Sequence, residues 1–388
     1  MNILHIAPNS PYNDYWGYQD NLLPKYHKKI GHNVTLIITN TMHKDGKIVE
    51  TECSDYVLDD GVRVIRLKKK QYLVGVLTNI NSKLSVYQYL KEIKPDFVFY
   101  HGLCSTTIFD VIRYKKEINP QCKIVQDNHM DYNNCGKMTG IKARIIQSFF
   151  KYINKKSVRY VSKVYGVTPW RKTFAEDYYG IPSDKTDVLI MGADDEKIDF
   201  SNRDKIRRRI REQYGISDSD FLIVTGGKID VDKHIDTLMK VCSEINQVKL
   251  LVFGQVFEEI KIKFYDMLEK CPNLIYIGWI NADVVYNYFF AADLVVFPGG
   301  HSVMWEQACA SKVPCLFRRW EGMEHVNNGG NSDFIDDISE EGLQKKVLEL
   351  LYTNKYYEMK KVAQSKATDI FLYSQIVKKS LECAEKDD

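Results

Sequence analysis

The sequence predicts an α/β protein built from two doubly wound parallel sheets, each flanked by helices. The chain has 388 residues, which is too long for a single hydrophobic core and suits two domains. Short apolar runs alternate with longer amphipathic ones, as in parallel sheets with crossover helices, and the alternation restarts after residues 180–183. We therefore expect two Rossmann-like domains facing a central cleft, residues 1–170 with 370–388 and residues 171–369. Ligands are expected at the carboxyl ends of the strands.

In the first half, runs of β-branched and aromatic residues between turn-forming residues mark the strands. The expected strands are Ile3–Ala7, Val34–Ile38, Val62–Leu67, Phe97–His101, Ile124–Asp127 and Val164–Val167. The expected helices are Tyr18–Lys29, Ile80–Ile93, Thr106–Glu117, Ile141–Tyr160 and Trp170–Tyr178. Pro24 lies inside the first helix and implies a kink or a later start, because proline has no N–H to donate.

The second half repeats the same alternation. The expected strands are Asp187–Ile190, Phe221–Thr225, Lys249–Phe253, Leu274–Ile277, Leu294–Phe297 and Cys315–Arg318. The expected helices are Arg203–Tyr214, Ile235–Ile245, Phe257–Lys270, Ala282–Ala291, Val303–Ala310, Glu340–Leu351, Lys355–Gln364 and Ile370–Ala384.

Composition argues against several classes of protein. A hydrophobic content of 44% is typical of a globular chain, and a formal charge of +3 without a nucleic-acid-binding motif predicts no nucleic-acid partner. The nine cysteines are scattered and never spaced as CxxC, which favours reduced thiols over disulfides or a zinc site. The first residues resemble a strand rather than a signal peptide, and no apolar run approaches the roughly 20 residues of a membrane span. We expect a cytoplasmic protein, soluble or peripheral on the inner face of the membrane.

Residues 295–310 combine a strand, a glycine turn and a helix. The strand ends at Phe297, glycines follow, and Ser302 can cap a helix that carries Glu306 in its second turn. Unpaired amides at the start of such a helix favour an anion, phosphate above all. The Glu306 carboxylate can accept two hydrogen bonds, as from the hydroxyls of a ribose. The alternative is an ordinary strand-to-helix turn with a surface glutamate.

Several motifs follow one another along the chain. They are Gly17-Tyr18-Gln19-Asp20, Gly31-His32-Asn33-Val34, Met191-Gly192-Ala193-Asp194, Gly227-Lys228 with Lys233, and Asn273-Leu274-Ile275-Tyr276-Ile277-Gly278. Together they resemble, in order, the glycine turn, GHxV, NGVD, GR with a later lysine, and NVxFxG of the family 4 glycosyltransferases, retaining enzymes of the GT-B fold. Trp16-Gly17 and Asp20 stand where the family has two glycines and a glutamate, and Lys228 stands where it has arginine. The resemblance covers most of the chain. It implies a donor held mainly by the second domain, an acceptor held by the first, and final helices that cross back.

The resemblance implies that Lys228 and Lys233 bind the diphosphate of a nucleotide sugar. Both follow a predicted strand that ends at Gly226-Gly227, so both ammonium groups can reach one cleft and stabilise the departing charge. No DxD triplet lies in a cleft-facing loop, so no metal and no cofactor are expected. Two solvated surface lysines are the alternative. The expected donor-binding residues are Gly17, Gly227, Lys228, Lys233, Gly278, Trp279, Gly300, His301, Ser302, Val303 and Glu306.

Glu306 matches the second glutamate of the family's E-x7-E motif, which resembles a ribose clamp. The first glutamate is missing, because Pro298 stands eight places upstream. In the family this loop contacts the transferred sugar, so the departure leaves the sugar open and makes His301 and Ser302 the expected sugar or phosphate contacts. Trp279 is expected beside the base, with a packing role as the alternative.

On the acceptor side, His129 follows the strand Ile124–Asp127 and resembles the family's histidine near the reacting sugar. A neutral imidazole there can hydrogen-bond a sugar hydroxyl, and His129, Lys233 and Glu306 form the expected catalytic set. His101 and Asp127 are the expected acceptor-side residues, with structural histidines as the alternative. The family transfers with retention and shows no clear nucleophile, which implies front-face attack in which the departing phosphate takes the proton of the acceptor.

Residues 136–166 are basic and lack acids. Within the helix expected over 141–163, one face is apolar and the rest basic, which suits anionic lipid or the pyrophosphate of a lipid-linked acceptor. The alternative is a core-facing stripe with a solvated basic back. The basic residues are Lys137, Lys142, Arg144, Lys151, Lys155, Lys156, Arg159 and Lys163, and the apolar ones are Ile145, Ile146, Phe149, Phe150 and Ile153.

We therefore expect a glycosyltransferase that moves a sugar from a nucleotide sugar, a UDP-sugar by family habit, to a surface glycan or lipid-linked saccharide. Two alternatives stay open: a nucleotide-sugar epimerase of the same fold, and a non-catalytic subunit that binds donor and activates a partner transferase. The missing first glutamate supports the second alternative.

Overall fold

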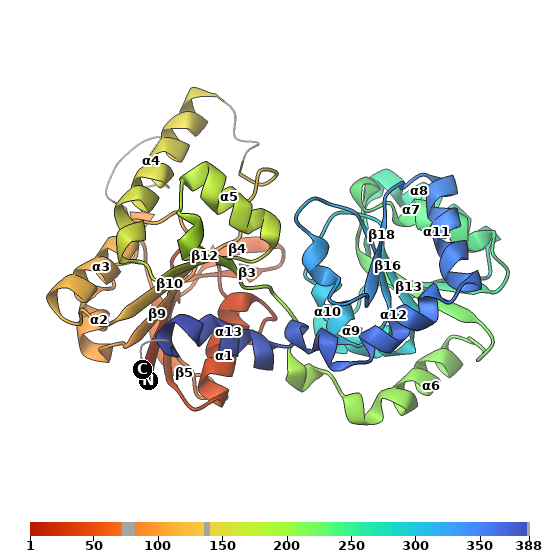
Figure 1. Ribbon diagram of the computed structural model, residues 1–388, viewed down its shortest axis with the longest axis horizontal. Coiled ribbons are helices and arrows are strands. Elements are labelled where there is room, and N and C mark those ends of the chain that lie inside the picture. The colour runs from red at the N-terminus through yellow and green to blue at the C-terminus, as the bar shows by residue number, and fades with distance from the viewer. Residues whose placement is uncertain (72–81, 136–139, 386–388) are drawn as a thin grey trace. The chain divides into compact units, whose positions relative to one another are not determined.

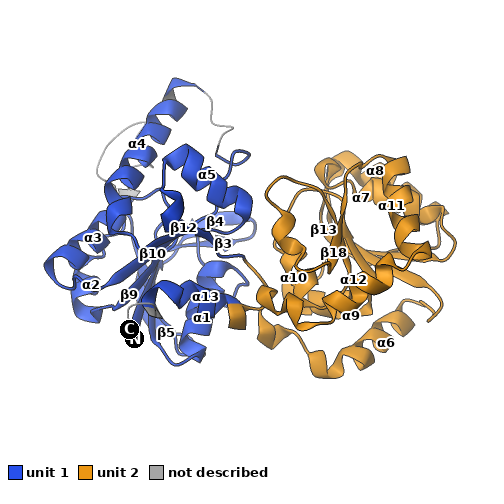
Figure 2. Ribbon diagram, viewed as in Figure 1, with its two compact units in different colours: residues 1–190, 376–388 blue, residues 191–375 orange. Residues whose placement is uncertain are grey.

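The computed structural model describes residues 1–71, 82–135 and 140–385 and divides the chain into two compact units (Figure 2). Unit 1 comprises residues 1–190 and 376–388, and unit 2 comprises residues 191–375. Each unit contains a mainly parallel sheet flanked by helices (Figure 1). The predicted α/β fold with two doubly wound sheets is confirmed. None of the described helices has both the length and the apolar character needed to span a bilayer.

Unit 1 contains an eight-stranded sheet in which every neighbouring pair is parallel except the last. In sheet order its strands are β12 (Thr186–Val188), β11 (Lys163–Gly166), β10 (Lys123–Asn128), β9 (Phe97–Tyr100), β1 (Asn2–Ala7), β2 (Asn33–Thr39), β6 (Arg63–Leu67) and β5 (Ser54–Val57). Two short antiparallel pairs lie outside it, β3 (Thr41–Lys44) with β4 (Lys47–Glu50) and β7 (Lys70–Gln71) with β8 (Ser82–Lys83). The sequence predicted none of β3, β4, β5, β7 and β8. The residues of β3, β4 and β5 are exposed or partly exposed and show no continuous apolar run.

Helices of unit 1 pack on this sheet and on one another. They are α1 (Gln19–Lys29), α2 (Tyr87–Ile93), α3 (Ile108–Glu117), α4 (Ile141–Ser157) and α5 (Pro169–Tyr179). α1 begins at Gln19 and continues through Pro24, so the later start that proline allowed is wrong. The helix expected from Ile80 begins only at Tyr87, after β8; Ile80 itself lies outside the described residues.

Unit 2 contains a six-stranded sheet that is parallel throughout. In sheet order its strands are β15 (Leu274–Tyr276), β14 (Val248–Val256), β13 (Phe221–Ile229), β16 (Leu294–Phe297), β17 (Cys315–Arg318) and β18 (Ser332–Ile335). Its helices are α6 (Arg203–Gln213), α7 (Ile235–Ser243), α8 (Glu258–Lys270), α9 (Val285–Ala291), α10 (Met304–Ala310), α11 (Glu340–Tyr352) and α12 (Lys355–Ala363). Apolar residues of β13, β14 and β16 pack against α7, α8 and α11 in the core.

The boundary between the units differs from the predicted one at residue 170. It falls at residue 190, because α5 packs on β11 and β12 pairs with β11, so both complete the sheet of unit 1. The strand expected to open the second domain is therefore the edge strand β12 of the first. The helix expected over Ile370–Ala384 is a 3₁₀ turn followed by α13 (Tyr373–Glu385), which joins unit 1 from residue 376.

Candidate functional site

The sheet of unit 2 changes direction between β13 and β16. From β13 the chain passes outward through β14 and β15, then returns to β16 and continues through β17 and β18 on the other side. In open α/β sheets, ligands bind beyond the carboxyl ends of the strands at such a switch point. The residues at the ends of β13 and β16 are therefore the first candidates for a binding site.

Glycines at the end of β13 allow close packing around Lys228. Gly227 has φ +105°, and a Cβ there would lie 2.4 Å from Cε of Met304. Gly254 on β14 has φ +125°, and a Cβ there would lie 1.9 Å from the carbonyl oxygen of Gly227. The backbone clash therefore requires glycine at 254, whereas at 227 the positive φ favours it because the methionine side chain can move. The sequence placed Lys228 after the strand, but β13 pairs with β14 as far as Ile229. Lys228 therefore projects from the strand itself and is exposed.

Lys233 lies in the turn between β13 and α7 and contacts the loop after β16. Its Nζ donates a hydrogen bond of 2.7 Å to the carbonyl oxygen of Gly300. A Cβ on Gly299 would lie 2.5 Å from the Cα of Lys233, so the loop and the lysine approach as closely as glycine permits. Burial lowers the pKa of Lys233; Asp230 opposes this shift and Lys228 adds to it.

The loop from Gly299 to Val303 carries unpaired amides. Among the described residues, none accepts a hydrogen bond from these backbone N–H groups. The helix α10 begins at Met304, and Val303 is its N-cap without a side-chain cap bond, so the prediction that Ser302 caps the helix is wrong. The backbone carbonyl oxygen of Ser302 instead accepts a hydrogen bond of 3.0 Å from the amide of Trp305. Free amides beside ammonium groups form a site for an anion.

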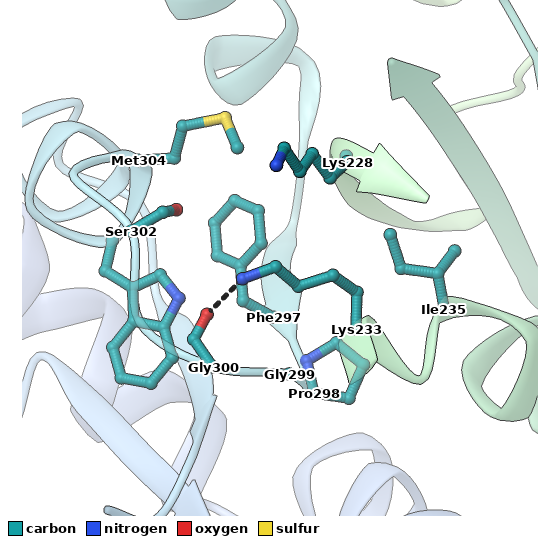
Figure 3. A pocket seen from close by; sticks show the side chains of 11 residues that line it. Lys228, Lys233, Ile235, Phe297, Pro298, Gly299, Gly300, Ser302 and Met304 are labelled. Carbon is teal, nitrogen blue, oxygen red and sulfur yellow. Dashed lines mark hydrogen bonds between the residues drawn. The ribbon is translucent and has the colours of Figure 1, made fainter. Parts of the chain in front are cut away.

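Both lysines and this loop line one pocket of about 240 Å³ (Figure 3). Figure 3 shows the ammonium ends of Lys228 and Lys233 directed toward the side where Ser302 and Gly300 lie. The expectation that the two cations converge with the start of α10 thus matches the geometry of unit 2. The lining residues are Gly226, Lys228, Lys233, Ile235, Phe297, Pro298, Gly299, Gly300, Ser302, Met304 and Trp305.

Glu306 does not line this pocket. Its side chain is fully buried, and its Oε1 lies 2.8 Å from Nε2 of His301 and 2.7 Å from Nε2 of His325. Burial alone would raise the pKa of Glu306, but the two histidines outweigh burial and lower it to about 2. The other oxygen, Oε2, is buried and has no partner in the described part of the chain. A ribose clamp therefore requires Oε2 to become accessible when the ligand binds.

Among the described residues, His301, Glu306 and His325 form a group that could hold a metal ion. One ligand atom from each lies within 4.8 Å of the others. A tetrahedral zinc ion at about 2.0–2.1 Å from its ligands separates them by about 3.3 Å, whereas the N···O distances here are 2.7 and 2.8 Å. The described geometry is thus that of a hydrogen-bonded triad, and a metal would have to spread it.

Three further predicted donor residues lie away from the pocket lining. Gly278 has φ +75°, and its carbonyl oxygen accepts from the amide of Gly254 at 2.8 Å. Trp279 is 72% exposed, so it does not pack into the core of unit 2 and its ring is free to meet a ligand. Gly17 belongs to unit 1, and neither its φ nor the space around it demands glycine.

In unit 1, the predicted acceptor-side residues lie together at the carboxyl ends of β9 and β10. Asp127 is fully buried, and its Oδ2 lies 2.8 Å from Nδ1 of His101 and 3.4 Å from Nε2 of His129. Its Oδ1 accepts from the amide of Gly102 at 2.7 Å. Burial would raise the pKa of Asp127, but the two histidines hold it below its usual range. The sheet order reverses between β1 and β9, so this cluster lies beside the switch point of unit 1.

The sequence did not reveal several residues of these sites. His325 lies in a short 3₁₀ helix, Glu324–Val326, after β17, and no spacing links it to Glu306. Trp305 stacks on Phe317 at 4.5 Å between ring centroids, and its buried indole N–H has no partner among the described residues although the side chain lines the pocket. The only signal for Met304 was its position beside the glycine turn.

Two doubly wound, mainly parallel sheets flanked by helices are the architecture of the GT-B fold. The fold matches a glycosyltransferase from Rickettsia africae ESF-5 (TM-score 0.70, 16% identity, 99% of each chain). It also matches Anabaena Alr3699/HepE in complex with UDP (TM-score 0.65, 16% identity, 99% of each chain). A third match is WaaG, a glycosyltransferase involved in lipopolysaccharide biosynthesis (TM-score 0.63, 15% identity, 99% of this chain and 100% of that one).

Residues 206–367, within unit 2, match the family model of glycosyl transferases group 1. This match, together with the glycosyltransferases of similar fold, confirms the predicted resemblance to the family 4 glycosyltransferases. UDP-N-acetylglucosamine 2-epimerases share the fold at lower TM-scores of 0.56 and 0.55. No curated protein sequence gives a significant match to the chain.

Proposed function

We propose that the protein is a glycosyltransferase that uses a nucleotide sugar, with UDP as the nucleotide. The observation that carries this proposal is the pocket of unit 2, about 240 Å³, which is lined by Lys228 and Lys233 and by Gly299, Gly300 and Ser302 of the loop with unpaired amides. A diphosphate leaving group develops charge as the sugar departs, and preorganised cations and amides stabilise that charge. The UDP in the structure of Alr3699/HepE supports the choice of nucleotide.

A binding screen tests this proposal directly. The full chain is titrated calorimetrically with UDP, ADP, GDP and CMP, and then with UDP-sugars, with inorganic phosphate as the reference anion. We expect UDP to bind more tightly than the other nucleotides and far more tightly than phosphate. Equal, weak binding of all these anions would contradict a nucleotide-sugar site.

The acceptor in this proposal is a glycan or lipid-linked saccharide of the cell surface, and the transfer retains the anomeric configuration. Retention fits a site in which the departing phosphate takes the proton of the acceptor hydroxyl. The configuration of the first product, observed by proton NMR before it can equilibrate, tests this point. An inverted product would refute the retaining mechanism but leave the transferase proposal standing.

Assays of the same protein preparation distinguish the proposed transferase from two alternatives, an epimerase and a non-catalytic subunit. An epimerase converts UDP-N-acetylglucosamine without an acceptor, and the epimerases of similar fold are the reason to include this assay. A non-catalytic subunit binds donor but turns over none with any acceptor. We expect no conversion of the donor alone beyond slow hydrolysis, and transfer once a saccharide acceptor is added.

The helix α4 supports a peripheral position on the inner face of the membrane. Of its predicted apolar stripe, Ile146 and Ile153 are buried in the core of unit 1, as the alternative reading expected. A second stripe faces outward, with Ile141 79%, Ile145 51% and Tyr152 53% exposed. Exposed basic residues flank it; those described are Arg144, Lys151, Lys155, Lys156 and Arg159. Lys137 lies outside the described residues.

An apolar stripe between cations is typical of a helix that lies in an anionic bilayer surface. Co-sedimentation with vesicles of phosphatidylglycerol and phosphatidylcholine measures this binding. Ile145→Glu is expected to reduce it, whereas Ile262→Glu, at an 88% exposed position on α8, is the matched control. Equal binding of both variants would contradict a role for α4.

A further inference from the structure

An unbroken chain of hydrogen-bonded side chains crosses the interior of unit 1. Oγ of Ser380 on α13 lies 2.9 Å from Nε2 of His27 on α1, whose Nδ1 lies 2.9 Å from Nε2 of His5 on β1. Nδ1 of His5 lies 3.1 Å from Nε2 of His101, whose Nδ1 lies 2.8 Å from Oδ2 of Asp127. All five side chains are buried. We refer to these five residues as the histidine relay.

The two ends of the relay determine how many protons it holds. The hydroxyl of Ser380 lies 2.6 Å from the carbonyl oxygen of Val377 and donates to it, so Ser380 accepts from His27. The carboxylate of Asp127 can only accept. Four hydrogen bonds between these ends therefore need four N–H groups, whereas three neutral imidazoles supply three. With the Ser380 hydroxyl donating to Val377, one ring of the three therefore carries an additional proton and a positive charge.

The surroundings place this charge on His101. Burial, together with the neighbouring rings, lowers the pKa of His5 well below its usual value. Burial, with His32 and His101 adding to it, lowers the pKa of His27 to about 3. Both of these rings are therefore neutral and carry their proton on Nε2. His101 alone contacts a carboxylate, so an imidazolium there forms a buried ion pair with Asp127.

One further acid faces this ion pair. Asp20 lies in the first turn of α1; burial raises its pKa, and although His101 and His129 oppose the shift, the charge of Asp127 adds to it. A carboxyl group with a raised pKa loses its negative charge more readily, so Asp20 is the weaker counter-ion for His101. Asp127 is therefore the principal counter-ion.

Beyond the outer end of the relay, Asp127 faces His129 at the surface of unit 1. Oδ2 of Asp127 faces Nε2 of His129 at 3.4 Å, and the imidazole of His129 is 44% exposed. A carboxylate there favours the tautomer with its proton on Nε2, which leaves Nδ1 as an acceptor for a sugar hydroxyl. The orientation of His129 thus depends on Asp127, whose charge depends on His101 and the rest of the relay.

We propose that Ser380, His27 and His5 are positioning residues that hold His101 as an imidazolium against Asp127, and that this ion pair orients His129 for the acceptor. The role toward an acceptor rests on the proposed function. The number and positions of the protons in the relay do not depend on the proposed function, so the two parts of the proposal are tested separately.

The first test is imidazole ¹⁵N NMR of the full chain labelled at histidine, with resonances assigned by single substitutions among the nine histidines. At neutral pH we expect His101 to be protonated on both nitrogens, and His5 and His27 to be protonated on Nε2 only. Three neutral rings in the wild-type protein, or protons on Nδ1 of His5 and His27, would overturn the proposal without any variant.

Ser380→Ala removes the acceptor at the inner end. Three N–H groups then satisfy the remaining bonds, so His5 and His27 are expected to switch from Nε2–H to Nδ1–H and His101 to lose its second proton. Ser374→Ala, on the same helix and outside the relay, is the control and is expected to change none of the three rings. Unchanged tautomers in Ser380→Ala would refute the relay.

The second test measures transfer. Ser380→Ala is expected to lower the rate at saturating donor about tenfold, the equivalent of one hydrogen bond, while UDP affinity stays at the wild-type value because that pocket belongs to unit 2. Wild-type transfer in a variant with switched tautomers would refute the positioning role. Absence of transfer in the wild-type protein would instead contradict the proposed function and leave the NMR result intact.

Discussion

Replacing Lys233 by methionine removes one positive charge from the pocket while keeping the apolar part of the side chain. A unit charge about 4 Å from a phosphate oxygen, at an effective dielectric constant of about 20, contributes about 4 kcal/mol, of which desolvation removes part. Hydrogen bonds to charged groups retain about 1.5–3 kcal/mol. We therefore expect Lys233→Met to weaken UDP binding about 10- to 150-fold.

The pH dependence of UDP binding is a second test of the role of Lys233. Burial lowers the pKa of Lys233 in the free protein, and a bound diphosphate stabilises its charged form and raises that pKa again. Affinity is therefore complete below the pKa of the free protein and declines as the pH rises through it. Calorimetric titrations of UDP at neutral and alkaline pH measure this decline, which Lys233→Met is expected to reduce.

The matched control is Lys345→Met, at an exposed position on α11 outside the pocket lining. It is expected to bind UDP with the wild-type constant at every pH. If Lys233→Met also retained the wild-type constant while circular dichroism showed it folded, the assignment of this pocket to a diphosphate would be refuted.

Three further predictions concern packing, acid stability and metals. Gly299→Ala is expected to lower the free energy of unfolding by about 1–3 kcal/mol, because its Cβ would lie 2.5 Å from the Cα of Lys233. Gly17→Ala is the control, since a Cβ there meets open space. Urea unfolding measures both variants. The pKa of Glu306 in the folded protein is about 2, below the ordinary value of 4.5 that applies to the unfolded chain. The ionised carboxylate therefore contributes about 3 kcal/mol to the free energy of unfolding above pH 4.5, and this contribution is lost as the pH falls toward 2. Acid unfolding of Glu306→Gln is expected to lack that loss, and an identical acid profile would contradict the depressed pKa. Dialysis against EDTA is expected to leave UDP binding unchanged, because fixed cations and amides stabilise the charge of the diphosphate. If EDTA instead weakened UDP binding, zinc restored it, and His325→Gln showed no such effect, the triad would be identified as a metal site.

Much of the donor pocket could be predicted from local sequence. Gly226-Gly227 and Pro298-Gly299-Gly300 end two apolar strands, and in a parallel sheet such ends lie at one edge. Turn residues and strand periodicity are local properties, so they predicted which loops meet and that Lys228 and Lys233 reach the same place. They did not predict that β13 continues to Ile229, because that extension depends on pairing with β14.

The acceptor-side cluster was predictable only in part. His101 and Asp127 follow or end predicted strands, so their common edge followed from the fold class. His5 and His27 were not recognised, because a histidine in a strand or helix has the same local signature whether it packs passively or joins a relay.

The sequence by itself determined the alternation of strands and helices, the glycine turns and the order of the family motifs, because these depend on neighbours a few residues apart. Only the tertiary structure brought His325 to Glu306, Ser380 to His27 and the edge strand β12 to unit 1. The partners in the first two pairs lie 19 and 353 residues apart, and burial removes water as an alternative partner. Such contacts form when whole elements pack, which is why no local pattern encodes them.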